Sequence, residues 1–181
     1  SLNLPDSSAV VTWHSSASTP LSVTQSITTS RPTLIKNKLN SHAVVQFDGI
    51  NDFLSGGDIN DIEANGFTMF IVGNTNKIEG TCWVAKANGA PRYFIIVRGS
   101  LKVAFAYNDN SGHHIDGTDA TINFDILTSV ADIPNGKNYF YQGGNLSGSL
   151  STVKDYDMNS NHEFLIGATG SSSSIALPLD G

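Results

Sequence analysis

Short apolar segments bounded by turn-forming residues recur along the whole chain, and this pattern limits the fold more than any other feature. The segments are rich in β-branched and aromatic residues, which suit the pleated surface of a strand. They cover 9–14, 42–47, 67–73, 81–87, 92–99, 101–108, 122–133, 137–142, 150–153 and 163–168. No long segment repeats apolar residues at the three- and four-residue spacing of an amphipathic helix. The sequence therefore predicts an all-β fold, an antiparallel β-sandwich.

Two hairpin turns can be assigned from their glycines. Gly99 and Ser100 separate two strong strand segments and suit a two-residue turn with glycine at its first central position. Gly143 and Gly144 predict a second hairpin turn farther along the chain. Both turns join neighbouring segments, as expected for an antiparallel sheet.

The length of 181 residues predicts one domain, covering 1–181, that can bury a sizeable core. Trp13 and Trp83 lie within strand segments, where a core position is favoured over a ligand platform. Cys82 is the sole cysteine, so neither an intramolecular disulfide nor a cysteine-based zinc site can form. A chain of this length can bury such a core without disulfides or metals to hold it together.

Charge is sparse, and its sign excludes one class of partner. Charged residues make up 14% of the chain, and most polarity comes from 22 Ser, 17 Asn, 17 Gly and 14 Thr. The net charge is −6 and the ten basic residues are scattered. Nucleic-acid-binding surfaces need clustered Lys and Arg to neutralise phosphates. We therefore expect no nucleic-acid partner.

Membrane insertion is not expected either. No apolar run approaches the roughly 18 residues of a membrane-spanning helix. Residues 1–8 have neither the basic start nor the apolar stretch of a signal peptide. A surface rich in uncharged polar groups suits an exposed setting, and we expect an extracellular surface or a virus particle.

Several motifs resemble one family. Residues 31–58 open with Arg31-Pro32 and contain a strand that closes on Phe-Asp-Gly-x-Asn-Asp-Phe-Leu at 47–54, and Gly-Phe-Thr follows at 66–68. Residues 126–144, which contain a hairpin, and the segment 164–181 add further likeness. This pattern resembles the laminin G-like, concanavalin A-type jelly-roll family over roughly residues 9–181. The resemblance implies a sandwich of two antiparallel sheets, a fold that hosts lectins, adhesion modules, hydrolases and structural decorations.

One part of the family pattern is not found. Family members usually continue after the Asp-Gly corner, here Asp180-Gly181, with a strand rich in Ile, Ala and Glu that closes the sheet. The resemblance therefore implies a domain lacking its C-terminal strand. If the chain is complete, the open edge would pair with a neighbouring protein, since unpaired strand backbone is a docking template.

The corner at 47–57 is interpreted first as a structural turn. Gly tolerates positive φ, and Asp or Asn side chains accept hydrogen bonds from backbone amides two residues on. The alternative is a calcium site, because hard oxygen ligands lie close in sequence. The candidate ligands are Asp48, Asn51, Asp52 and Asp58. Their spacing does not supply the six or more ligands that calcium needs, so no cofactor is predicted and calcium remains an alternative.

A catalytic role is not expected. Glucanases of this architecture carry Glu-x-Asp-x-Glu on one strand, and this chain has Ile59, Asp61 and Glu63 at those positions. Retaining glycoside hydrolysis needs two carboxyl groups in different protonation states, and the nucleophile position is apolar here. Neither a Gly-x-Ser-x-Gly motif nor a phosphate-binding loop occurs. We therefore predict no enzymatic activity.

The most polar segment, 107–119, is the candidate ligand site. It follows a strong strand, and loops in that position carry binding residues. The residues able to contact sugar hydroxyls or stack on a sugar are Tyr107, Asn108, Asp109, Asn110, His113, His114 and Asp116. A plain solvated loop and a metal site are the alternatives, although adjacent histidines point to opposite sides of an extended chain.

The sequence therefore predicts a non-enzymatic surface-display or binding module that binds glycans or acts in adhesion. The alternative is a virion structural or decoration protein of a capsid or fibre, whose partners are neighbouring subunits in an oligomer or particle.

Overall fold

The computed structural model describes residues 2–60, 66–77, 80–86, 88, 92–98, 102–108, 112–119, 123–151 and 159–181. Every strand pairing in these residues is antiparallel. The described residues contain no α-helix and one 3-10 turn, η1 (Thr28–Ser30). The predicted all-β antiparallel fold is confirmed.

One layer is a large sheet of eight strands. In spatial order these are β11 (Gly112–Asp119), β10 (Lys102–Asn108), β9 (Arg92–Arg98), β8 (Thr81–Lys86), β15 (Phe164–Ile166), β6 (Leu54–Ser55), β3 (Ser22–Thr24) and β2 (Thr12–His14). Segments distant in sequence are therefore neighbours, since β15 pairs with both β8 and β6.

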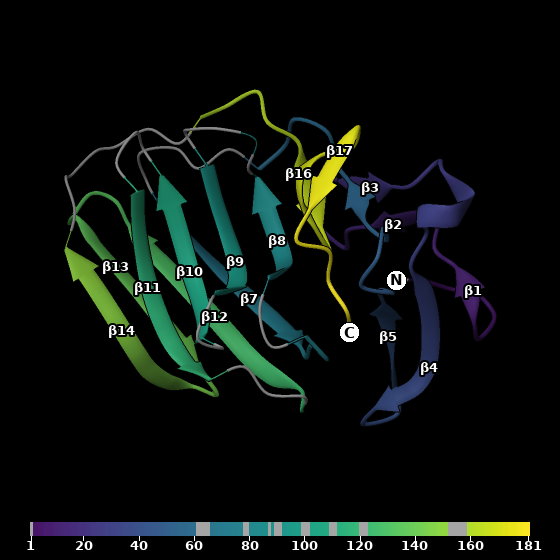
Figure 1. Cartoon of the computed structure of the whole chain (residues 1–181), viewed down its shortest axis with the longest axis horizontal. Coiled ribbons are helices and arrows are strands. Elements are labelled where there is room, and N and C mark those ends of the chain that lie inside the picture. The colour runs from purple at the N-terminus through teal and green to yellow at the C-terminus, as the bar shows by residue number, and fades with distance from the viewer. Residues whose placement is uncertain are drawn as a thin grey trace.

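The second layer consists of two smaller sheets. The four-stranded sheet has the order β14 (Asn145–Ser151), β13 (Lys137–Gln142), β12 (Asp125–Asp132) and β7 (Phe67–Gly73). The three-stranded sheet has the order β1 (Ser8–Ala9), β4 (Thr33–Leu39) and β5 (His42–Gln46). Figure 1 shows the four-stranded sheet on the left of the molecule and β1, β4 and β5 on the right.

The core lies between the layers because the strands alternate in polarity. Alternate residues of β12 and β13 are buried, and the residues between them face outward. The main core cluster joins Leu127 and Phe140 of the four-stranded sheet to Ile95 and Phe105 of the large sheet. A second cluster joins Leu34 to the β3 and β6 end of the large sheet. These contacts make the molecule a sandwich.

The central strand of the large sheet is covered on both faces. All six residues of β8 are buried. A short hairpin, β16 (Thr169–Ser171) and β17 (Ser174–Ala176), packs over the outer side of this region, where Phe53, Leu165 and Ala168 form a separate buried cluster. A strand covered in this way reads as a continuous apolar run rather than an alternating one.

Both predicted hairpins form. β9 and β10 pair with Arg98 opposite Lys102, and the predicted turn residues Gly99 and Ser100 lie outside the described residues. The second turn forms as predicted at Gly143 and Gly144, whose φ angles are +58° and +80°. Positive φ at both central positions is typical of a type I′ turn, which suits glycine.

The core prediction is confirmed for one tryptophan and wrong for the other. Trp83 of β8 is 5% exposed, whereas Trp13 of β2 is 36% exposed. β2 is the last strand of the large sheet and two of its three residues are exposed. The sequence correctly predicted a strand around Trp13, but its side chain is exposed because β2 lies at the end of the sheet.

Candidate functional site

The corner after β5 is built by reciprocal aspartate hydrogen bonds. Asp48 Oδ1 accepts hydrogen bonds from the backbone N–H groups of Ile50, Asn51 and Asp52, over 2.8, 3.1 and 3.2 Å. Asp52 Oδ2 accepts one from Asp48 N over 3.1 Å. Gly49, at φ +74°, makes the turn without a Cβ clash against Asp180. The structural interpretation of the corner is therefore the one its geometry supports.

The two aspartates of the corner have opposite pKa shifts. Burial works to raise the pKa of Asp48, but the backbone hydrogen bonds from Ile50, Asn51 and Asp52 lower it below its ordinary value. Burial raises the pKa of Asp52 to about 6, the charge of Asp48 adds to this rise, and the hydrogen bond from Asp48 N opposes it. Asp48 is thus kept charged, whereas Asp52 is protonated more readily than an ordinary aspartate.

We predict that replacing Asp52 with asparagine removes a pH dependence of stability. The folded pKa of about 6 exceeds the ordinary value of 3.8, so the folded chain binds this proton more tightly than the unfolded chain. The stabilisation is complete below pH 3.8 and lost as the pH rises through about 6. Asp48 has a lowered pKa, so the stability that it contributes is lost only as the pH falls below its ordinary value of 3.8.

Urea unfolding at pH 4.5 and 7.5 measures this effect. At each pH, the free energy of unfolding of Asp52→Asn is subtracted from that of the parent chain. This difference should be lower at pH 7.5 than at pH 4.5. An unchanged or larger difference at pH 7.5 would contradict the assignment.

A buried lysine holds the segment that follows the corner. Lys86 of β8 is fully buried, and its Nζ donates to Asp58 Oδ1 over 2.6 Å and to Ile59 O over 3.0 Å. The ion pair compensates a charge that would otherwise be costly to bury. Asp58 is thus fixed to β8, and its side chain remains 49% exposed.

The calcium alternative stays a prediction. Asp48 and Asp52 use their carboxylates on backbone amides and Asp58 pairs with Lys86, so a calcium ion would have to compete with these bonds. Within the described ranges, no three His, Cys, Asp or Glu side chains gather into a group that could hold a metal. The carboxyl pair Asp61 and Glu63 lies outside the described residues.

The polar segment 107–119 forms strands rather than the predicted loop. Tyr107 and Asn108 end β10, and residues 112–119 form β11, so only 109–111, which include Asp109 and Asn110, lie between the strands and outside the described residues. The loop prediction is wrong for the strand residues because polar side chains fit an edge strand that has one face in water. In space, Tyr107 pairs with His113, so the backbone does bring these predicted residues together.

Two of these candidates have described side chains. His114 and Asp116 are exposed on the same face of β11, and His114 Nε2 lies 3.8 Å from Asp116 Oδ2. They remain predicted ligand contacts.

The outer face of the four-stranded sheet exposes several large apolar side chains, and no motif in the sequence pointed to it. Its exposed apolar members are Phe70, Val72, Ile126 and Leu146, which are 71, 56, 48 and 56% exposed. Strand alternation places these residues opposite the core. The face also carries Thr68, Thr128, Val130, Tyr139, Tyr141 and Ser149. These side chains carry no charge, but Asp132 and Lys137, which pair with each other in the next row, continue the same alternation and place charges at one end of the face.

Strand register arranges the face in rows. Phe70 pairs with Thr128, Thr128 with Tyr141, and Tyr141 with Leu146. Thr128 therefore lies between Phe70 and Tyr141 on neighbouring strands. Tyr139 and Tyr141 are two residues apart on β13, with ring centroids separated by 6.5 Å and planes tilted by 36°. The signal for this face was the alternation of aromatic with core residues in 67–73 and 137–142.

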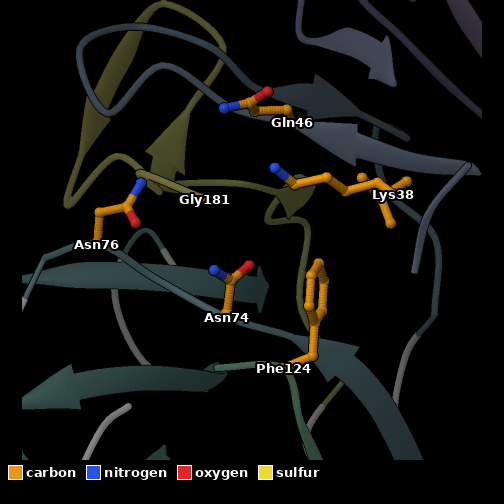
Figure 2. A pocket seen from close by; sticks show the side chains of 7 residues that line it. Lys38, Gln46, Asn74, Asn76, Phe124 and Gly181 are labelled. Carbon is orange, nitrogen blue, oxygen red and sulfur yellow. The ribbon is translucent and has the colours of Figure 1, made fainter. Parts of the chain in front are cut away.

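A small pocket with polar and apolar lining lies at the junction of the two sheets of the second layer (Figure 2). Its volume is about 80 Å³. The lining residues are Lys38, Val44, Gln46, Asn74, Asn76, Phe124 and Gly181. Figure 2 shows that the Lys38, Gln46 and Asn74 side chains and the Phe124 ring surround a common space.

No family model matches the chain, and a search of curated proteins finds no match. Among the described residues, no helix has the length and apolarity needed to cross a membrane.

Several solved structures resemble the fold. The CBM40 of the Ruminococcus gnavus IT-sialidase, bound to α2,3-sialyllactose, has 13% identity and a TM-score of 0.54, covering 66% of this chain and 72% of its own. A heptameric SAP-like pentraxin from Limulus polyphemus has 12% identity and a TM-score of 0.57, covering 75% and 70%. Domain 4 of AbnA, a GH43 extracellular arabinanase from Geobacillus stearothermophilus, in complex with arabinotriose, has 14% identity and a TM-score of 0.56, covering 82% and 71%. These likenesses show that the chain has the fold of an antiparallel β-sandwich of jelly-roll type.

Proposed function

We propose that this chain is a non-enzymatic glycan-binding module and that the outer face of the four-stranded sheet contacts the sugar. The observation that carries the proposal is the uncharged row of Phe70, Thr128 and Tyr141 on adjacent strands. Aromatic rings stack on the apolar faces of sugar rings, and hydroxyl groups beside them hydrogen-bond the sugar hydroxyls. Two of the solved structures with a similar fold hold oligosaccharides, which supports a glycan as ligand.

The β10–β11 residues form a second proposed contact. His114 and Asp116 supply polar groups on the exposed side of an edge strand, and Tyr107 precedes the turn. Such a module would act where glycans are displayed, on a cell surface or a particle. Calcium is not required by the proposed stacking contact.

A glycan array tests the proposal. The labelled chain should bind a subset of neutral or acidic oligosaccharides, and titration with the best of them should show about tenfold weaker affinity for Phe70→Ala. The array should be probed in calcium and in chelator, because calcium dependence would point to the aspartate corner instead.

Ile50→Ala is a matched control, because Ile50 is 74% exposed and Phe70 is 71% exposed. It should leave the affinity unchanged. Absence of binding under both conditions, or equal affinity for Phe70→Ala and the parent chain, would refute the proposed surface.

The exposed apolar residues also favour a second candidate, a structural subunit of a virion or another particle. Contiguous apolar surface marks protein contact sites as well as ligand sites. Under this alternative the chain forms stable oligomers that Phe70→Asp dissociates, as sedimentation would show, and it binds no glycan.

A further inference from the structure

The outer face of the four-stranded sheet changes in character along its strands. At one end it presents Val72, Ile126 and Leu146, which are 56, 48 and 56% exposed. At the other end, Asp132 of β12 pairs with Lys137 of β13. Among the described residues of this face, these two carry the only charged side chains. A ligand with one charged group can therefore be matched at one end of the face and not at the other.

Lys137 continues the line of the two tyrosines. Lys137, Tyr139 and Tyr141 take alternate positions along β13, and the residues between them are buried. Side chains at alternate positions share one face of a sheet and follow each other at roughly 6.6 Å per step. The two tyrosine ring centroids are 6.5 Å apart, so Lys137 stands about one such step beyond Tyr139. A sugar chain that lies on the tyrosines along β13 therefore reaches Lys137 with its next unit.

The ammonium group of Lys137 is drawn toward β14. Because β13 lies between β12 and β14 (Figure 1), Asp132 and Ser151 pair with Lys137 from opposite sides. Lys137 Nζ donates to Ser151 Oγ over 2.8 Å, on the β14 side. An ammonium group has three N–H donors, and a bond to a neutral hydroxyl leaves its charge uncompensated. The ion pairs found among the described residues do not include Lys137.

The carboxylate of Asp132 is used within its own turn. Residues 133–136 join β12 to β13, and Gly136 N donates to Ile133 O over 3.0 Å to close this turn. Asn135 Nδ2 donates to Asp132 Oδ1 and Oδ2 over 3.0 and 2.9 Å. Asp132 thus stabilises the turn and does not neutralise Lys137.

We propose, building on the glycan contact proposed above, that the sugar is acidic and that its anionic group lies at Lys137. The ligand is an oligosaccharide with a carboxylate or a sulfate at one end, and its neutral units stack on Tyr139 and Tyr141. An ammonium group donates charge-assisted hydrogen bonds to such anions, and the Ser151 hydroxyl that holds it can donate to the same anion. The net charge of −6 disfavours anionic ligands elsewhere on the chain, so Lys137 also fixes the direction of the sugar along β13.

Calorimetric titration with matched trisaccharides tests this proposal. The probes are β1,4-linked trisaccharides of glucose and of galactose, either neutral or with a uronic acid or an O6-sulfated sugar at one end or the other. In at least one series, the parent chain should bind an anionic form about fivefold more tightly than the neutral form, the upper end of the range for an exposed ion pair. The form that binds more tightly, uronic acid or sulfated, identifies the anion.

Lys137→Gln should abolish the preference for the anionic form. The affinity for that form should fall about fivefold, while the affinity for the neutral form stays the same. Lys137→Arg keeps the charge and should keep the preference. Lys102→Gln is a matched control, because it removes an exposed lysine from the large sheet and changes the net charge equally. It should leave the preference intact.

Backbone amide shifts locate the anion directly. The shifts induced by the anionic and the neutral form should differ most at Lys137 and Ser151 and agree around Phe70. Differences centred on any other part of the chain would overturn the assignment.

Three titration results would also overturn it: equal affinity of the parent chain for neutral and anionic forms, a preference that survives Lys137→Gln, or no binding of any trisaccharide. Phe70→Ala separates such a failure from a failure of the proposed function. If Phe70→Ala weakens both forms and no anionic preference exists, the face binds glycan and the assignment of Lys137 alone is wrong.

Discussion

Replacing Phe140 with alanine should lower the free energy of unfolding by about 3–5 kcal/mol, the cost of removing a buried aromatic ring and leaving a cavity. Phe140 is 0% exposed and belongs to the main core cluster. A Cβ on Gly117 of β11 would lie 2.7 Å from the Phe140 ring, so the ring packs directly on the backbone of the opposite layer. Its neighbours therefore cannot easily collapse into the space it leaves.

Urea unfolding monitored by circular dichroism measures this loss. Phe70→Ala is a matched control, because it removes the same side chain from the same sheet at a position that is 71% exposed. Its cost should stay within about 0.5 kcal/mol. Similar costs for the two variants would contradict the assignment of the inner and outer faces of the four-stranded sheet.

Removing the partner of the buried lysine should be the second large effect. Asp58→Ala leaves the fully buried Lys86 without the carboxylate that accepts its 2.6 Å hydrogen bond. We expect a loss of about 3 kcal/mol, the lower end of the range for breaking a buried ion pair, because the Asp58 side chain is 49% exposed and water replaces part of the contact.

A double-mutant cycle isolates the charge effect. In a Lys86→Met background no buried charge remains, so adding Asp58→Ala should cost less than about 0.5 kcal/mol. Asp116→Ala, which removes an exposed carboxylate, should cost equally little in the parent chain. If Asp58→Ala costs the same in both backgrounds, the ion pair does not hold the segment.

The fold class could be predicted because its signal is local. Alternation and β-branched residues define strands such as 67–73 and 137–142, and the paired glycines at 143 and 144 define a turn. The aspartate corner was also predictable, since a side chain that bonds the amides two residues on needs only nearby partners.

Other features depend on partners that are distant in sequence. β6 has two residues and forms only because β15 and β3 lie on either side of it. β11 is polar and therefore resembles a loop until its pairing with β10 is known. The burial of Lys86 depends on Asp58, 28 residues earlier, and the exposure of Trp13 depends on its place at a sheet end.

The candidate binding face was missed for a related reason. The residues 67–73 and 137–142 were correctly predicted as strands, but the outward position of Phe70 and Tyr141 becomes a surface only when β7, β12 and β13 are placed side by side. The junction pocket combines side chains from four separate parts of the chain and has no sequence signal.

Backbone amide chemical shifts during titration with the strongest array oligosaccharide test the central claim most directly. We predict shift changes at the amides of β7, β12 and β13 that surround Phe70, Thr128 and Tyr141. Changes confined to β10 and β11, to the junction pocket, or to no residue at all would contradict glycan binding on the outer face of the four-stranded sheet.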